Sequence, residues 1–177
     1  MLSALKTYLD IALLRRGPSD LPASTSLLVA TVSVFLALNI GLSAWLRPQI
    51  VSLVPQHLVS VAVALGWYFI LLRLFARPER YVQMITAVFG VGCVVAPILV
   101  PASAFVARYA ERPQEAMPYM ILLLPLAGYV VYVSARILRD TIERPMFQCV
   151  MLVLAQTMLE ALILVSLFGS GQPAAAG

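Results

Sequence analysis

The 177-residue sequence has little charge, few cysteines and a single histidine. Only 11% of its residues are charged and 62% are hydrophobic, whereas a soluble domain has about 25% charged and about 45–50% apolar residues. A water-soluble fold could not bury this much apolar surface, so lipid must be the main solvent of the chain. The basic residues flank apolar runs and no nucleic-acid-binding motif occurs, which excludes a nucleic-acid partner.

The residues that catalytic and metal sites need are equally scarce. A single histidine excludes the HExxH zinc motif, and neither GxSxG nor a phosphate-binding loop occurs. The aspartates, which all lie outside the apolar runs, are Asp10, Asp20 and Asp140. Cys93 and Cys149 lie within apolar runs, where small buried core residues are favoured over a disulfide or metal site. We therefore expect no enzyme activity, no cofactor and no metal.

Long hydrophobic runs, by contrast, are abundant. A membrane-spanning helix needs about 20 apolar residues to cross about 30 Å of hydrocarbon. The runs that qualify are about 25–46, 51–75, 81–107, 118–134 and 145–168. The alternating pattern of a membrane β-barrel is absent. The sequence therefore predicts an all-α fold, a polytopic transmembrane bundle with five spans within residues 21–169.

The segments outside the bundle are short. Residues 1–20 are predicted to form a cytoplasmic N-terminal segment with a short amphipathic helix over 2–14. Its apolar face carries Leu2, Leu5, Leu9, Ala12 and Leu13. We expect this helix to lie in the interface of the inner leaflet, with packing against the cytoplasmic ends of the spans as the alternative. Residues 170–177 are predicted to be a flexible tail; together with Gly169 they read GSGQPAAAG.

The distribution of basic residues predicts the orientation. Of the 12 lysines and arginines, all but Arg47, Arg108 and Arg112 fall on the side that includes the N-terminal segment. The positive-inside rule then places the N-terminus in the cytoplasm and the C-terminus outside, which is the periplasm for a bacterial inner-membrane protein. The arginines that we expect to meet lipid head groups, or only to set the topology, are Arg77, Arg80, Arg139 and Arg144. The aromatic residues predicted to form interfacial belts are Trp45, Trp67, Tyr68, Tyr81, Tyr109 and Tyr119.

Polar side chains inside the spans are the candidate functional residues. Asn39, His57 and Glu160 are predicted to lie at similar depth, within about 5 Å of one another along the membrane normal. Gln156 precedes Glu160 by one turn, and Cys149, Gln156 and Glu160 share one helical stripe that should face protein. The readings left open are interhelical hydrogen bonding, which we favour, a proton or ion path, and a site for a partner or lipid.

The third run contains TAVFGVGCVVAPILVPASAF. Gly90 and Gly92 would allow close helix approach. Pro97 and Pro101 are a candidate helix break, which would expose backbone carbonyls to a substrate or ion. The alternative is that they only bend the helix.

Parts of the sequence resemble the bacterial members of the Yip1 superfamily. The resemblance lies in ARPERYVQMITAVFGVG at 76–92 and in the Gly128-Tyr129 pair, together with five spans and a cytoplasmic N-terminal segment. RRGPSDLPAS at 15–24 also resembles a short proteobacterial inner-membrane family of unknown role. The DLYGP motif of eukaryotic relatives is missing, and RRGPSDLP stands in its place. The resemblance implies a membrane-organising or partner-binding protein without catalytic residues.

The leading functional hypothesis is a non-enzymatic integral inner-membrane protein. We expect an accessory or scaffold subunit that binds another membrane protein, or itself as a homo-oligomer. The alternative is a small transporter or channel that uses Asn39, His57 and Glu160. A lipid-handling protein with a lateral opening is a third possibility.

Overall fold

The computed structural model describes residues 2–46, 52–109 and 113–169, which are helical apart from short connections and contain no strand. The helices are α1 Leu2–Ala12, α2 Thr25–Leu46, α3 Leu53–Leu74, α4 Tyr81–Arg108, α5 Pro113–Ile142 and α6 Met146–Phe168, with the short 3-10 helices η1 Pro18–Asp20 and η2 Pro78–Arg80. Within these ranges five helices are long and apolar enough to cross a membrane. The predicted all-α bundle with five spans and a short N-terminal helix is confirmed. The predicted tail, 170–177, lies outside the described residues.

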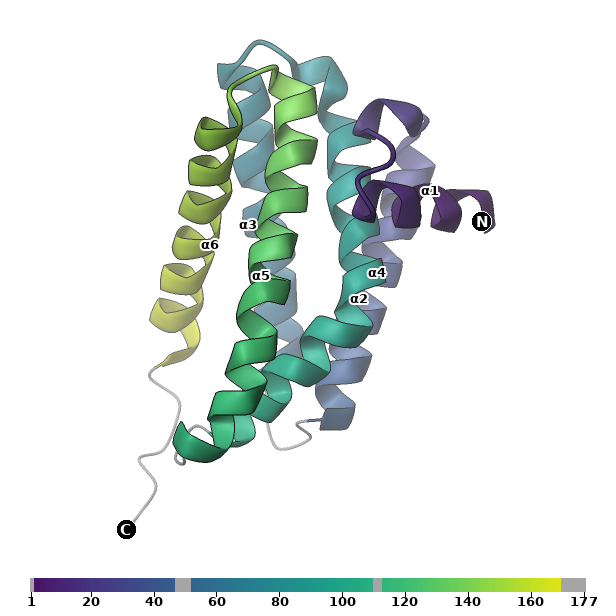
Figure 1. The fold of residues 1–177 in the computed structure, drawn as a ribbon. Helices are drawn as coiled ribbons and strands as arrows, with labels where there is room; N and C mark the ends of the chain where they lie inside the picture. The colour runs from purple at the N-terminus through teal and green to yellow at the C-terminus, as the bar shows by residue number, and fades with distance from the viewer. Residues whose placement is uncertain (1, 47–51, 110–112, 170–177) are drawn as a thin grey trace.

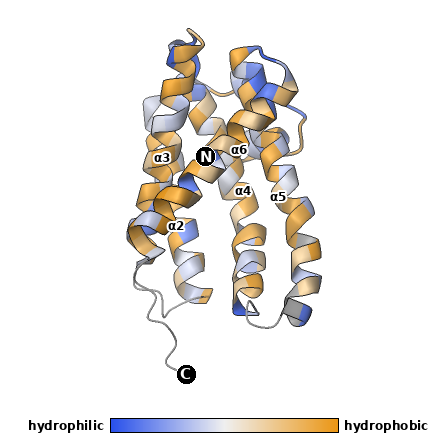
Figure 2. Cartoon of the chain, turned by 90° about the vertical axis from the view of Figure 1, so that its left-hand side faces the viewer, coloured by the Kyte–Doolittle hydropathy of each residue, from blue (hydrophilic) through white to orange (hydrophobic). Residues whose placement is uncertain are grey.

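The five long helices form a bundle (Figure 1). Among them, α4 has the largest buried share. α4 packs against α2, α3 and α5, while α6 packs against α5 and α3. Hydrophobic residues cover most of the length of these helices (Figure 2). We call the end that carries the α3–α4 and α5–α6 connections the basic end, because Arg77, Arg80, Arg139 and Arg144 gather there, and the opposite end the far end.

The fourth span is longer than predicted. The sequence prediction placed it at about 118–134, but α5 begins at Pro113 and continues through the charged stretch ARILRDTI to Ile142. Ala135, Ile137, Leu138 and Ile142 are all buried, because this charged stretch is amphipathic and packs its apolar face on the bundle. Arg136 and Arg139 therefore project from the last turns of a helix, while Arg144 lies in the connection to α6.

The buried residues gather toward the basic end, within about 23 Å of it at about 1.5 Å per residue, and extend slightly past the middle of α3 and α4. In α3 they begin at Val61, and in α5 at Val133, each continuing to the basic end. In α4 they stop at Ala96, and in α6 at Val153. The largest fully buried side chains of the spans include Tyr68, Leu72, Met84, Ile85 and Leu138. No described residue of α3 beyond Val61 or of α4 beyond Ala96 toward the far end is buried, so the tight core lies on the side of the basic end.

The burial of Tyr68 corrects one prediction. The sequence assigned Tyr68 to an interfacial aromatic belt, but its side chain is only 1% exposed and belongs to the core. Trp45 is 77% exposed near the far end of α2, as a belt residue would be.

The N-terminal helix α1 lies crosswise against the sides of the long helices (Figure 1). Tyr8, Ile11 and Ala12 are buried, whereas Leu5 and Leu9 are exposed on the outer face. The ring of Tyr8 lies over Gly90, about 14 Å along α4 from its start at about 1.5 Å per residue. α1 therefore packs against the sides of the long helices, between the basic end and the middle of the bundle. Local sequence did not indicate this depth.

Two polar contacts and one close approach fix α1 in place. The Tyr8 hydroxyl and the Thr31 hydroxyl of α2 are 2.8 Å apart. Because Thr31 donates its own proton to the Leu27 carbonyl, Tyr8 must be the donor. The Tyr129 hydroxyl of α5 donates to the Ala12 carbonyl. The absence of a side chain at Gly90 makes the approach of the Tyr8 ring possible.

Pro97 and Pro101 do not break α4. The helix continues through both residues to Arg108, and its ribbon bends in the half that contains them (Figure 1). Of the two predicted outcomes, a break with exposed carbonyls and a bend, the structure has the bend.

Candidate functional site

The predicted polar residues belong to three helices, α2, α3 and α6. Asn39, Ser60 and Glu160 each lie about 21 Å from the basic end of their own helix at about 1.5 Å per residue. That depth is beyond the last buried residues of α3 and α6, Val61 and Val153, and level with Val95 of α4. The polar residues therefore occupy the level at which tight packing gives way to partly exposed side chains.

His57 connects α3 with α2. Its Nδ1 lies 2.8 Å from the Leu53 carbonyl oxygen, which can only accept, so Nδ1 carries a proton. Its Nε2 lies 3.4 Å from the Ser43 hydroxyl of α2. A neutral imidazole with the proton on Nδ1 satisfies both contacts, because Ser43 can donate to the bare Nε2.

Glu160 connects α6 with α3. Its carboxyl group is a hydrogen-bonding neighbour of the Ser60 hydroxyl and interacts electrostatically with His57. The carboxyl and the imidazole are thus close enough to affect each other, with Ser60 one turn from His57 on the same helix. The structure therefore brings together two of the predicted polar residues, His57 and Glu160. Ser43 and Ser60 are additional members of this group.

Asn39 and Gln156 are placed differently. The Asn39 amide nitrogen donates to the Phe35 carbonyl of its own helix, at 2.8 Å. Gln156 is half-buried on the α6 stripe between the fully buried Cys149 and Glu160, and it has no hydrogen-bond partner among the described residues. The stripe thus faces the bundle at its basic end and is less covered further along.

Sequence reasoning missed Ser43 and Ser60 because serine is common in membrane spans, and a single serine there has a low free-energy cost. The signal that could have found Ser60 is its spacing of three from His57, which places both residues on one face of α3. In the parts of the chain that the structure describes, no three His, Cys, Asp or Glu side chains come together as a metal site would require.

The arginines at the basic end have protein partners. Arg77 and Arg80 both pair with Glu143, with N–O distances of 3.0 Å each. Arg80 also donates to the backbone carbonyls of Asp140 and Thr141, at 3.4 and 3.0 Å. These carbonyls belong to the last turn of α5, which has no intrahelical donors for them. Arg80 therefore caps α5 from the neighbouring helix.

The other two predicted lipid-contacting arginines differ. The guanidinium of Arg144 lies 5.3 Å from the centre of the Phe75 ring, a cation–π contact. Arg139 is exposed in the last turn of α5. Head-group contact remains a prediction for all four arginines. Arg139 has no hydrogen bond or ion pair with a described residue, whereas Arg77, Arg80 and Arg144 each have at least one protein contact.

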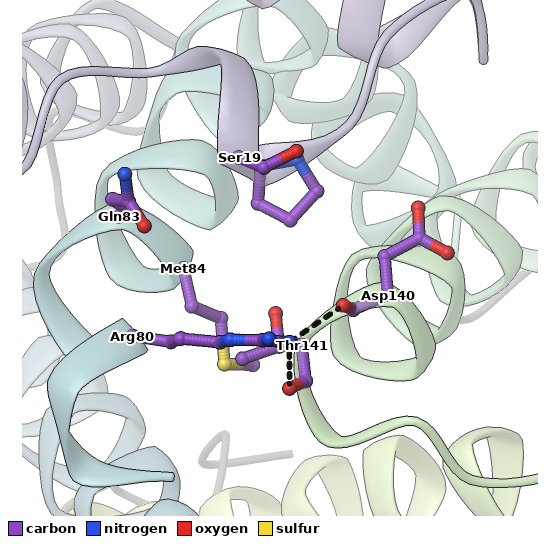
Figure 3. Close-up of a pocket in the computed structure, with 7 residues that line it drawn as sticks. Ser19, Arg80, Gln83, Met84, Asp140 and Thr141 are labelled. Atoms are coloured by element: carbon purple, nitrogen blue, oxygen red, sulfur yellow. Dashed lines mark hydrogen bonds between the residues drawn. The ribbon is translucent and has the colours of Figure 1, made fainter.

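Two pockets lie at the ends of the bundle. One, of about 280 Å³, lies at the basic end between η1, the start of α4 and the end of α5 (Figure 3). The other, of about 270 Å³, lies at the far end between α2 and α4, where Trp45, Phe105 and Arg108 line it. Neither pocket is lined by Asn39, His57, Gln156 or Glu160. Comparisons with protein-family models, with curated proteins and with solved structures found no match to this chain.

Proposed function

We propose that this multi-pass membrane protein is a non-enzymatic accessory or scaffold subunit that binds another membrane protein through α6. The five apolar helices fit a protein of a lipid bilayer. The basic residues support a bacterial inner-membrane protein with a cytoplasmic N-terminus, and the Yip1-like segments support a membrane-organising role.

The observation that carries the proposal is the incomplete cover of Glu160 and Gln156. α6 has the smallest buried share of the five spans, and both polar side chains are only half-buried at hydrocarbon depth. A polar group that faces lipid is costly. A helix from a partner that packs on α6 would cover these groups and supply hydrogen bonds that the chain itself does not.

The test is to purify the tagged full-length chain in mild detergent and identify what co-purifies in stoichiometric amounts. Glu160→Gln keeps the hydrogen-bonding capacity and should retain the partner. Glu160→Leu should weaken retention, because an interhelical hydrogen bond is worth about 0.6 kcal/mol on average and up to about 1.7 kcal/mol. Asn39→Leu is the matched control, since the Asn39 amide bonds its own helix and its loss should leave the partner bound.

A small proton-linked transporter is the second candidate. The observation that favours it is the series of polar groups Ser43, His57, Ser60 and Glu160, which links α2, α3 and α6. Transport would require a carboxyl group that gains and loses a proton, so Glu160→Gln would abolish proton uptake into proteoliposomes. A stoichiometric partner lost only in Glu160→Leu supports the subunit. Repeated isolation of the chain alone, with proton uptake that Glu160→Gln removes, supports the transporter.

A further inference from the structure

The pocket at the basic end has walls of opposite charge. Its lining includes Ser19 from η1, Arg80 from the end of η2, Gln83 and Met84 from the start of α4, and Asp140 and Thr141 from the end of α5. Arg80 extends across the pocket toward the carbonyls of α5 (Figure 3). The volume of about 280 Å³ suits a group smaller than a drug-sized ligand, since pockets for such ligands begin at about 300 Å³.

The cation of the pocket is not saturated. The hydrogen bonds of Arg80 to the described residues all use Nη1, which serves the carbonyls of Asp140 and Thr141 and the carboxylate of Glu143. Nη2 and Nε remain as charged donors. Guanidinium groups bind phosphate and carboxylate oxygens well because their donors are arranged as a planar fork.

The acceptors of the pocket are also free. The Asp140 carboxylate has no hydrogen bond or ion pair with a described residue, and its side chain is turned away from the Arg80 guanidinium (Figure 3). Gln83 uses its amide nitrogen to donate to the Leu21 carbonyl at 2.9 Å, which leaves its amide oxygen as an acceptor. A carboxylate and an amide oxygen on opposite walls are suited to an ammonium group, which has three donors and no acceptor.

We propose that this pocket binds a zwitterion in which a primary ammonium group lies next to a phosphate, that is, a phosphoethanolamine group. The phosphate is bound by Arg80, and the ammonium by Asp140 and Gln83. Two sources carry this group: the head group of an ethanolamine phospholipid and free phosphoethanolamine. The pocket lies where α4 and α5 leave the apolar part of the bundle, which is head-group depth. This inference is independent of the partner proposed for α6.

The first experiment uses native mass spectrometry of the full-length chain titrated with phosphatidylethanolamine or with phosphatidylcholine of the same acyl chains. Methylation of the amine in phosphatidylcholine removes its hydrogen-bond donors. We expect the ethanolamine lipid to bind about tenfold more tightly, the equivalent of one charge-assisted hydrogen bond. Equal binding of the two lipids, together with no stabilisation by free phosphoethanolamine, would overturn the proposal.

The second experiment identifies the residues and the source. Asp140→Asn should reduce the preference for the ethanolamine group to near one, since Asp140 has no structural partner to lose. Glu79→Gln, an exposed carboxylate on η2 outside the pocket lining, should leave the preference unchanged. In phosphatidylcholine nanodiscs, a rise in melting temperature with millimolar phosphoethanolamine that Asp140→Asn removes assigns the site to the free compound. A preference seen only with the lipid assigns it to the head group. If Asp140→Asn keeps the wild-type preference for the ethanolamine group, the proposed binding of the ammonium by Asp140 is wrong.

Discussion

Gly90 is the residue on which the position of α1 depends. A Cβ atom built there would lie 2.4 Å from Cδ1 and 2.6 Å from Cε1 of the Tyr8 ring, closer than atoms can pack. The ring cannot move alone, because its hydroxyl is bonded to Thr31. The absence of a methyl group at Gly90 thus makes room for the Tyr8 ring of α1.

Gly90→Ala should therefore detach or displace α1. Overpacking of a fitted contact costs about 1–3 kcal/mol, and here the cost falls on the docking of α1 because α4 is held on several sides. The measurement is limited proteolysis of the N-terminal segment in detergent, which should become faster, together with the melting temperature, which should fall. Gly128→Ala is the control, since nothing lies within 4 Å of its Cβ position and alanine favours the helix. Equal protection of the N-terminal segment in both variants would show that α1 does not depend on this contact.

At the scale of elements, the ends of three helices share one feature. α1, α3 and α5 are each followed by a non-glycine residue in the left-handed region, namely Leu14, Ala76 and Glu143 with φ of 61°, 54° and 56°. Glycine is the usual residue there because a Cβ atom is disfavoured at positive φ. At Glu143 this backbone coincides with the carboxylate that receives Arg77 and Arg80, while Ala76 has no such compensation.

Ala76→Gly should stabilise the protein, by up to about 1 kcal/mol. The same substitution at Ala62, an exposed position inside α3, should destabilise it by about 1 kcal/mol because glycine disfavours a helix interior. Melting temperatures of the two variants and the wild type in one detergent test both signs. If Ala76→Gly lowers the melting temperature as Ala62→Gly does, the left-handed backbone at position 76 carries no strain.

The elements also show what the sequence could and could not predict. Run length and apolar content predicted the spans because lipid solvation acts on every residue of a helix. At the start of α2 the Ser24 hydroxyl accepts the Leu27 amide at 3.3 Å, a local contact of the kind that sequence can indicate. The extension of α5 to Ile142 was missed because charges interrupt the run. The contact of Tyr8 with Gly90 depends on residues that are remote in sequence, and local patterns carry no information on it.

At the scale of the whole molecule, packing differs between the two halves of the bundle. The described buried residues stop near Val61 in α3 and Val153 in α6, and side chains further toward the far end are partly or fully exposed. The sequence is equally apolar in both halves, so hydropathy alone could not predict this difference. For the candidate site, depth could be predicted from residue counts, but the pairing of Glu160 with Ser60 could not.

Spin-label distances should reveal the difference between the halves. Labels at Leu74 and Phe147 report on α3 and α6 at the basic end, and labels at Val54 and Leu167 report on the same two helices at the far end. All four positions are exposed. In a background without Cys93 and Cys149, pulsed electron paramagnetic resonance in nanodiscs should give a broader distance distribution for the far pair. Equal widths would mean that the far half is as tightly held as the core.

The confinement of the core to one half has a mechanical consequence. Close-packed protein interiors have low compressibility, so the cross-section of the basic half is nearly constant. The far half can change its cross-section at lower cost, because beyond Val61 in α3 and Ala96 in α4 no described side chain is buried. A change in the lateral pressure or thickness of the surrounding bilayer would therefore deform one leaflet's share of this protein and leave the other's unchanged.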